Sequence, residues 1–143
     1  MTLPYCFGSE FLMFDKLKPS PFMNTDTWID QNDLAFAVLD GYPVSPGHTL
    51  VLPKRKAASF LNDLSSQERA ACMSLVWTRW LVLKDAIDPS LGGPMGFNIG
   101  INDGIYAGQT IGHAHVHLIP RYAGDHPNPR GGVRAVIPGK ATY

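Results

Sequence analysis

The sequence predicts a mixed α+β domain in which an antiparallel sheet packs against one long helix. Three observations favour this class: short β-rich runs bounded by Gly and Pro, one long helical pattern, and a chain order without alternating strands and helices. The 143 residues are 45% hydrophobic and 17% charged, which is ordinary for a globular protein. We therefore expect one domain over residues 1–143.

The two ends of the chain differ in composition from its middle. Residues 1–27 are rich in Pro, Phe and Met without a clean period, which predicts an irregular N-terminal arm with one short helix. Residues 122–143 are rich in Pro, Gly and Arg and predict a C-terminal tail, with one β-like run at 133–137.

Two β-rich runs in the first half predict an antiparallel hairpin. Residues 34–39 form an apolar run that ends in the turn sequence of residues 40–43. Residues 48–53 form a second run, bounded by Gly and Pro. We expect the two runs to pair across a wide loop.

The clearest helix is predicted to begin at Ser65. Ser65 and Glu68 have the spacing of a capping box, in which two side chains bond to otherwise unpaired amides. The segment 88–94, with its Pro and Gly residues, ends the pattern. Helical spacing predicts one buried stripe, made of Cys72, Leu75, Val76, Leu83 and Ile87.

The second half predicts two more strands. Residues 95–101 predict the first, residues 104–108 a loop, and residues 113–119 the second strand, closed by Pro120. That last run places His113, His115 and His117 at alternate positions. On a strand their imidazoles share one face, with neighbours about 6.7 Å apart.

Three interpretations of the histidine row remain open. Single histidines are usually structural, but three of the chain's five histidines lie in this one short segment. A zinc site is the second interpretation, although same-face residues of a straight strand diverge and no HExxH or CxxC motif supplies further ligands. Nucleophilic catalysis at phosphorus is the third, because a neutral imidazole is a good nucleophile and its neighbours can donate hydrogen bonds.

Residues 113–119 resemble the signature of the histidine triad (HIT) family, His-φ-His-φ-His-φ-φ with φ apolar. Asp40 and the segment 46–54 look like its other hallmark, and the resemblance runs from about residue 34 to 121. The tail segment 128–134 looks like that of bacterial members, and the type is that of diadenosine tetraphosphate hydrolases. The resemblance implies a HIT-like fold: a five-stranded antiparallel sheet, one long helix and a short one, with the sheet extended across a homodimer.

The family's chemistry is nucleotidyl transfer to a histidine, followed by hydrolysis that releases a nucleoside monophosphate. By position, the resemblance makes His115 the nucleophile at the α-phosphorus. It implies that His113 and His117 orient the nucleophile and stabilise the phosphoryl oxygens. His48 matches an upstream histidine that supports the triad.

The resemblance also implies a set of substrate-binding residues. Asp40 matches the acid that binds the ribose hydroxyls, and Asn102, Gln109 and Thr110 match phosphate contacts. Asn98 is a phosphate or structural contact. The substrate is expected to be a purine nucleotide, with adenine favoured by family habit. Its base pocket is expected to come from apolar residues near Asp40 and from the N-terminal arm, with Phe7, Phe11 and Phe36 as candidates.

A zinc site found in many bacterial relatives is damaged in this sequence. The family site uses an N-terminal CxxC and histidines, whereas here Cys6 stands without its partner, Ser9 replaces it, and Lys56 stands where a histidine is expected. We predict no structural zinc and no cofactor, although a divalent metal can accompany a polyphosphate substrate.

Charge and hydropathy exclude some functions. Lys and Arg together number 12, as do Asp and Glu, so no basic excess favours nucleic acid or a membrane surface. No segment approaches the roughly 20 apolar residues of a membrane helix, and no secretory signal is visible, so we expect a cytoplasmic location.

We expect a hydrolase acting on dinucleoside polyphosphates or nucleoside phosphoramidates, with a sulfate anhydride also open. The alternative is a nucleotide-binding regulatory module with little turnover. A metal-dependent hydrolase is the third option.

Overall fold

The computed structural model describes residues 16–143, which form one five-stranded antiparallel sheet with a single α-helix against it. The sheet order is β1-β2-β3-β5-β4. The strands are β1 (Asp30–Gln31), β2 (Ala35–Leu39), β3 (Thr49–Pro53), β4 (Gly96–Ile101) and β5 (Val116–Arg121). The helix is α2 (Ser66–Leu83), and three 3-10 turns are η1 (Thr25–Thr27), η2 (Ile105–Ala107) and η3 (Gly132–Val136). The predicted fold class is confirmed, whereas the expected short helix is present in the described residues only as 3-10 turns.

The β2–β3 hairpin has the predicted form. All five residues of β2 pair with β3, from Ala35 opposite Pro53 to Leu39 opposite Thr49. β1 was not predicted, because two residues are too few to show a period. It pairs antiparallel with β2 and adds the outer strand on that side.

Helix α2 begins as predicted and ends earlier than predicted. Ser65 Oγ accepts the Glu68 amide at 3.1 Å, and Glu68 Oε2 accepts the Ser65 amide at 2.8 Å. The helix stops at Leu83, so the expected burial of Ile87 is wrong, and that side chain is 74% exposed. The chain turns because Asp88 and Gly92 exchange both backbone hydrogen bonds and close a tight loop.

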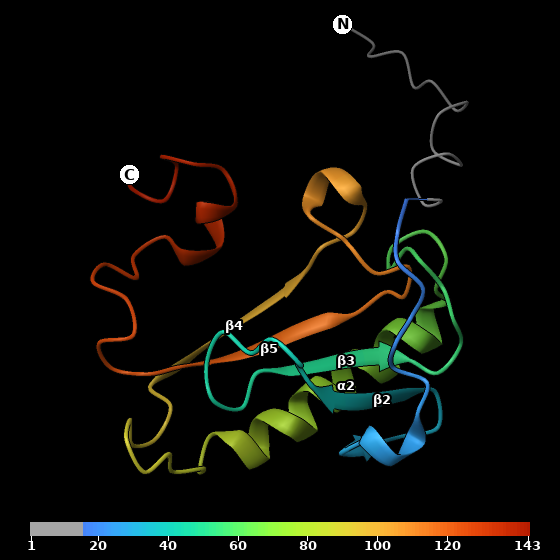
Figure 1. Cartoon of the computed structure of the whole chain (residues 1–143), viewed down its shortest axis with the longest axis horizontal. Helices are drawn as coiled ribbons and strands as arrows, with labels where there is room; N and C mark the ends of the chain where they lie inside the picture. Colours follow the sequence, from blue (N-terminus) through green and yellow to red (C-terminus); the bar gives the residue numbers. More distant parts are fainter. Residues whose placement is uncertain (1–15) are drawn as a thin grey trace, which may run out of the picture.

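The two faces of the sheet are covered by different parts of the chain. Helix α2 packs on one face through its buried stripe of Cys72, Leu75, Val76 and Leu83. On the other face Phe36, Val38, Leu50 and Leu52 pack against Phe22 and Trp28, which precede β1. Figure 1 shows α2 along one side of the sheet, with the η2 loop and the C-terminal tail extending from the other. Phe22 of the arm and the neighbouring Trp28 therefore form part of the second layer.

The segment that carries the histidines is extended only in its second half. β5 begins at Val116, so the predicted strand over residues 113–119 is wrong at its start. The preceding backbone leaves the sheet: Ala114 N–H donates to Ala57 O at 2.7 Å, in the connection after β3. The three histidines consequently do not form a row on one strand.

β5 also continues past the predicted stop at Pro120. β3 pairs with β5 only from Val116 to Leu118. Pro120 lies beyond this pairing, so its lack of an N–H group removes no hydrogen bond between β3 and β5. The Pro120 carbonyl instead accepts the Ser45 hydroxyl at 2.6 Å. β4 is left as an edge strand of the sheet.

The tail contains a 3-10 turn where a β-like run was predicted. Residues 132–136 form η3, which follows Gly131 at φ 74°. Arg134 Nε donates to Lys140 O at 2.9 Å and holds the turn against the following segment. Local bonds within the tail thus replace pairing with the sheet. None of the helices in residues 16–143 has the length and apolar character to cross a membrane.

Candidate active site

A cavity of about 640 Å³ lies on the face of the sheet opposite α2. Its walls come from the arm, the loop after β2, the segment 102–111 and the beginning of β5. The polar lining residues are Lys18, Thr27, Asp40, Tyr42, His48, Asn102, Thr110, His115 and His117. The apolar ones include Phe22, Val38, Leu39, Val44, Leu50 and Ile111. The cavity therefore has the size and mixed lining of a small-molecule site.

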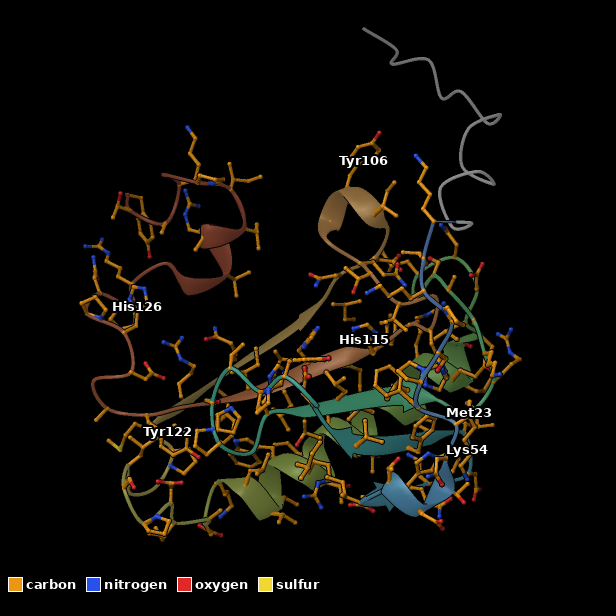
Figure 2. The ribbon with its side chains drawn as sticks, viewed as in Figure 1. Met23, Lys54, Tyr106, His115, Tyr122 and His126 are labelled. Carbon is orange, nitrogen blue, oxygen red and sulfur yellow. The ribbon has the colours of Figure 1, made fainter. Side chains whose placement is uncertain are left out.

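His115 is positioned by a bond to the backbone of its neighbour in the triad. Its Nδ1 lies 2.8 Å from His113 O. A carbonyl oxygen can only accept, so Nδ1 carries the proton and a neutral His115 has its lone pair on Nε2. The imidazole lines the cavity and is 8% exposed. Figure 2 shows His115 at the beginning of β5, with Tyr106 pointing outward from the η2 loop and His126 in the tail.

His113 lies beneath the cavity, outside its lining. Its side chain is fully buried, with Nε2 2.7 Å from Pro53 O and Nδ1 2.8 Å from Ser20 Oγ. Burial lowers the pKa of His113, so the ring is neutral. Nε2–H then donates to Pro53, and Nδ1 accepts the Ser20 hydroxyl. The expectation that His113 stabilises phosphoryl oxygens is wrong, because both ring nitrogens are already bonded within the protein.

His48 and His117 form a directly bonded pair. His48 Nδ1 accepts the Val44 amide at 3.2 Å, so the proton of a neutral His48 is on Nε2. His48 Nε2 lies 2.9 Å from His117 Nδ1, which therefore accepts. The proton of His117 is consequently on its own Nε2. His115 and His117 stand edge to face, with ring centroids 5.0 Å apart.

Both members of this pair are held neutral. Burial lowers the pKa of His48, against the opposing effect of Asp40. Burial, followed by the neighbouring His115 and His48, lowers the pKa of His117 to about 4. At neutral pH the pair therefore offers N–H donors without a positive charge.

Asp40 follows β2 and lines the same cavity. Its Oδ1 accepts the Tyr42 amide at 2.8 Å, which fixes the turn, and its Oδ2 lies 3.4 Å from His48 Nε2. With His48 neutral, this second contact is not a hydrogen bond, because the one proton on His48 Nε2 is donated to His117 Nδ1. The carboxylate keeps acceptor capacity toward the cavity.

The four predicted binding residues other than Asp40 divide into two groups. Asn102 and Thr110 line the cavity, and their contact with phosphate stays a prediction. Gln109 does not: its Oε1 accepts the Gly104 amide, and its Nε2 donates to Ala58 O and Ile111 O. Its amide bonds fix the loop and leave no donor for phosphate, so that expectation is wrong.

Asn98 also lies outside the cavity. Its Oδ1 accepts Arg121 Nη1 at 2.6 Å, in a smaller hollow of about 290 Å³ that includes Asp125 and His126. Of the two roles expected for Asn98, the contacts favour the structural one. The base-pocket candidate Phe36 is fully buried below the cavity, and the candidates Phe7 and Phe11 lie outside the described residues.

The arm was expected to contribute to the base pocket, but sequence reasoning did not identify Lys18, Ser20 or Phe22. Lys18 and Phe22 line the cavity, and the Phe22 and His115 ring centroids are 6.3 Å apart. Ser20 lies between them and bonds to His113. The arm has no period from which these positions could be predicted, and its Pro residues gave only a signal for irregular backbone.

Asp40, His48 and His117 are a group that could hold a metal ion. Their ligand atoms lie within 4.8 Å of one another. A cation there would replace the proton shared by the two histidines, so metal binding and the observed hydrogen bond exclude each other. Cys6 and Ser9, on which the prediction about structural zinc depends, lie outside the described residues.

Comparison with known proteins gives concordant results. The model of one protein family, described as HIT domain, matches residues 22–124. An AP-4-A phosphorylase from Mycobacterium tuberculosis is 38% identical over 98 residues, which cover 68% of this chain and 47% of that protein. An asymmetrical bis(5'-nucleosyl)-tetraphosphatase from Schizosaccharomyces pombe is 39% identical over 92 residues, with coverage of 64% and 47%. The chain thus spans about half the length of these curated relatives.

A solved structure shows the same fold. A HIT family protein from Bacillus anthracis superposes with a TM-score of 0.61 at 33% sequence identity. The superposition covers 69% of this chain and 66% of that chain.

Proposed function

Because the chain belongs to the HIT domain family, we propose that it is a nucleotide hydrolase in which His115 attacks the α-phosphorus of a bound nucleotide. The single observation that carries the proposal is the bond from His115 Nδ1 to His113 O. It holds the Nδ1 proton and leaves the Nε2 lone pair for phosphorus, inside a cavity of nucleotide size.

The first step forms one bond and breaks one. His115 Nε2 donates its electron pair to the α-phosphorus, and the bond from phosphorus to the leaving oxygen or nitrogen breaks. The leaving group takes that electron pair and a proton from solvent. His115 keeps its Nδ1 proton, so its ring becomes cationic, and the His113 carbonyl stabilises that charge. His117 Nε2–H donates to a phosphoryl oxygen or to the leaving atom.

Water completes the reaction in the second step. A water oxygen bonds to phosphorus, the phosphorus–nitrogen bond breaks, and the electron pair returns to His115 Nε2. The water loses one proton to solvent or to the phosphate products. The nucleoside monophosphate then leaves, and His115 is again neutral.

Different parts of the cavity lining bind the ribose and the base of the nucleoside. Asp40 has free acceptor capacity, so its carboxylate accepts hydrogen bonds from the ribose hydroxyls. The apolar lining of Phe22, Leu39 and Leu50 surrounds the base. Asn102 and Thr110 lie on the segment that precedes the triad and donate to phosphate. Adenine is the proposed base, in keeping with the name of the M. tuberculosis relative.

The lining favours a dinucleoside polyphosphate over a phosphoramidate. Among the described residues that line the cavity, Lys18 is the one Lys or Arg, and it lies beside Thr110. A polyphosphate carries negative charge beyond the α-phosphorus, and an ammonium group stabilises that charge. The leaving amine of a phosphoramidate has no such charge. The names of both curated relatives also support this substrate class.

We further propose that the protein acts as a homodimer. Met73, Trp77 and Ile99 are 43%, 59% and 45% exposed and lie on α2 and β4. Trp77 stacks on Trp80, which packs edge-on against Phe97 of β4. We call these five residues the α2–β4 surface. β4 is an edge strand, so a second copy that pairs there extends the sheet and covers this surface.

Turnover of purified protein tests the proposed function. Diadenosine tetraphosphate should be cleaved with release of AMP, and His115→Ala should lower kcat by about a thousandfold or more. His126→Ala, in the exposed tail, is the matched control and should keep wild-type kcat. Undiminished turnover in His115→Ala would reject the mechanism. Nucleotide binding without turnover in the wild-type protein would instead support a regulatory binding module.

A further inference from the structure

Ser20 lies outside the catalytic cavity but bonds to the triad. Its Oγ is 2.8 Å from His113 Nδ1, and it is not among the residues that line the cavity. The arm that carries it is fixed on its N-terminal side: Lys18 N donates to Thr110 O at 2.9 Å, and Gly112 N donates to Lys18 O at 2.8 Å. Ser20 is therefore held in place independently of any substrate.

Three hydrogen bonds connect Ser20 to the nucleophile. The Ser20 hydroxyl donates to His113 Nδ1, and His113 Nε2–H donates to Pro53 O at 2.7 Å. These two bonds fix the rotation of a fully buried ring. The backbone carbonyl of the same residue then accepts His115 Nδ1–H at 2.8 Å. Each bond has one possible direction, because the carbonyls at Pro53 and His113 can only accept.

The tautomer of His115 depends on the last bond in this series. A neutral imidazole without an acceptor at Nδ1 favours the form with its proton on Nε2, and that form has no lone pair on Nε2 to attack phosphorus. The rate of the first step is proportional to the fraction of His115 in the reactive form. Any change that moves the His113 carbonyl therefore lowers the rate without removing a substrate contact.

We propose that Ser20 is a positioning residue, which keeps His115 in its nucleophilic tautomer by fixing the ring and carbonyl of His113. The expected effect on kcat rests on the proposed function. The expected effect on the tautomer of His115 rests on the three hydrogen bonds alone. Ser20 touches neither the substrate site nor His115, so its effect is confined to kcat.

The kinetic test compares Ser20→Ala with the wild-type protein on diadenosine tetraphosphate. Loss of the hydroxyl leaves a buried acceptor without a donor. We expect kcat to fall about tenfold while KM changes less than about twofold. Ser65→Ala is the matched control, because it removes a structural serine at the helix cap, remote from the triad, and should keep wild-type kcat. Equal kcat in Ser20→Ala and the wild-type protein would overturn the proposal.

A conservative variant separates positioning from folding. Ser20→Cys keeps a weak donor of similar size. Its kcat should lie between those of the wild-type protein and Ser20→Ala, and it replaces the alanine variant if that one does not fold. A cysteine variant with kcat at or below that of the alanine variant would contradict the proposal.

A measurement without substrate separates this inference from the proposed function. Long-range ¹H–¹⁵N spectra of ¹⁵N-histidine protein report which ring nitrogen carries the proton. The wild-type protein should show His115 protonated on Nδ1 and His113 on Nε2, and Ser20→Ala should shift His115 toward Nε2–H. Unchanged tautomers in the variant would overturn the inference even if the enzyme turns over. A shifted tautomer in a protein without turnover would sustain it while the proposed function fails.

Discussion

His48 Nε2 donates to His117 Nδ1 across 2.9 Å, from the residue before β3 to a residue of β5. The direction of this bond follows from the Val44 amide, which occupies the other nitrogen of His48. His117 consequently presents an Nε2–H group, the donor that the proposed mechanism requires. One histidine outside the triad thereby sets the tautomer of a histidine within it.

Removal of His48 should impair catalysis through His117. In His48→Ala, Nδ1 of His117 loses its hydrogen-bond donor. The tautomer of His117 with its proton on Nε2 is then no longer enforced. We expect kcat to fall by about ten- to a hundredfold, the range of a lost proton donor. Steady-state kinetics on diadenosine tetraphosphate measure the effect, with His126→Ala as the control. Wild-type kcat in His48→Ala would show that the pair has no catalytic role.

Stability should rise with pH between about pH 5 and pH 7. The pKa of His117 is lowered to about 4, and those of His48 and His113 are also lowered. In this window the unfolded chain binds more protons than the folded protein, so the free energy of unfolding increases with pH. Glu68, whose pKa is lowered to about 2 by Arg55, loses its contribution only in more acidic solution. Urea midpoints at several pH values test this, and a constant or falling midpoint from pH 5 to 7 would contradict it.

Lys18→Ala should discriminate between the two substrate classes. Loss of one ammonium group near the outer phosphates should raise KM for diadenosine tetraphosphate about fivefold, an effect of roughly 1 kcal/mol that weakens with added salt. KM for adenosine 5'-phosphoramidate should stay within about twofold. Lys16→Ala is the control, since Lys16 is exposed and does not line the cavity. An equal effect of Lys18→Ala on both substrates would remove the support for a polyphosphate.

A charge on the α2–β4 surface should dissociate the proposed dimer. Trp77 is 59% exposed on this surface, so a carboxylate that is buried there in Trp77→Glu opposes association. Sedimentation velocity should give a dimer for the wild-type protein and a monomer for the variant. Tyr106→Glu is the matched control, because Tyr106 is 89% exposed and points away at the tip of the η2 loop (Figure 2). A monomeric wild-type protein would refute the dimer.

The predictable parts of the fold are those with a regular period. The hairpin of β2 and β3 and the capping box at Ser65 follow from alternation, turn chemistry and helical spacing, and all are present. The strand over the triad was mispredicted because alternation of His113 and His115 with apolar residues imitates a strand. In the structure the His113 ring is instead buried and bonded to Pro53 O, and the His113 carbonyl accepts the proton of His115 Nδ1.

The site was predictable where residue type determines the role. His115, His117, His48 and Asp40 meet in one cavity, as the family resemblance implies. Side-chain amides were less predictable, because an amide serves equally well in binding a ligand and in fixing a loop. Gln109 does the second, with its oxygen and both N–H groups bonded within the protein. The individual arm residues Lys18, Ser20 and Phe22 could not be assigned, since their contacts arise from tertiary structure alone.

The proposed mechanism requires a covalent bond between His115 Nε2 and phosphorus. Rapid acid-free quenching during turnover of diadenosine tetraphosphate, followed by intact-mass and peptide mass spectrometry, measures this directly. We expect an adduct with the mass of an adenylyl group on His115, labile in acid and absent from His115→Ala. An adduct on another residue, or full turnover by the wild-type protein without any adduct on His115 under conditions that slow hydrolysis, would contradict it.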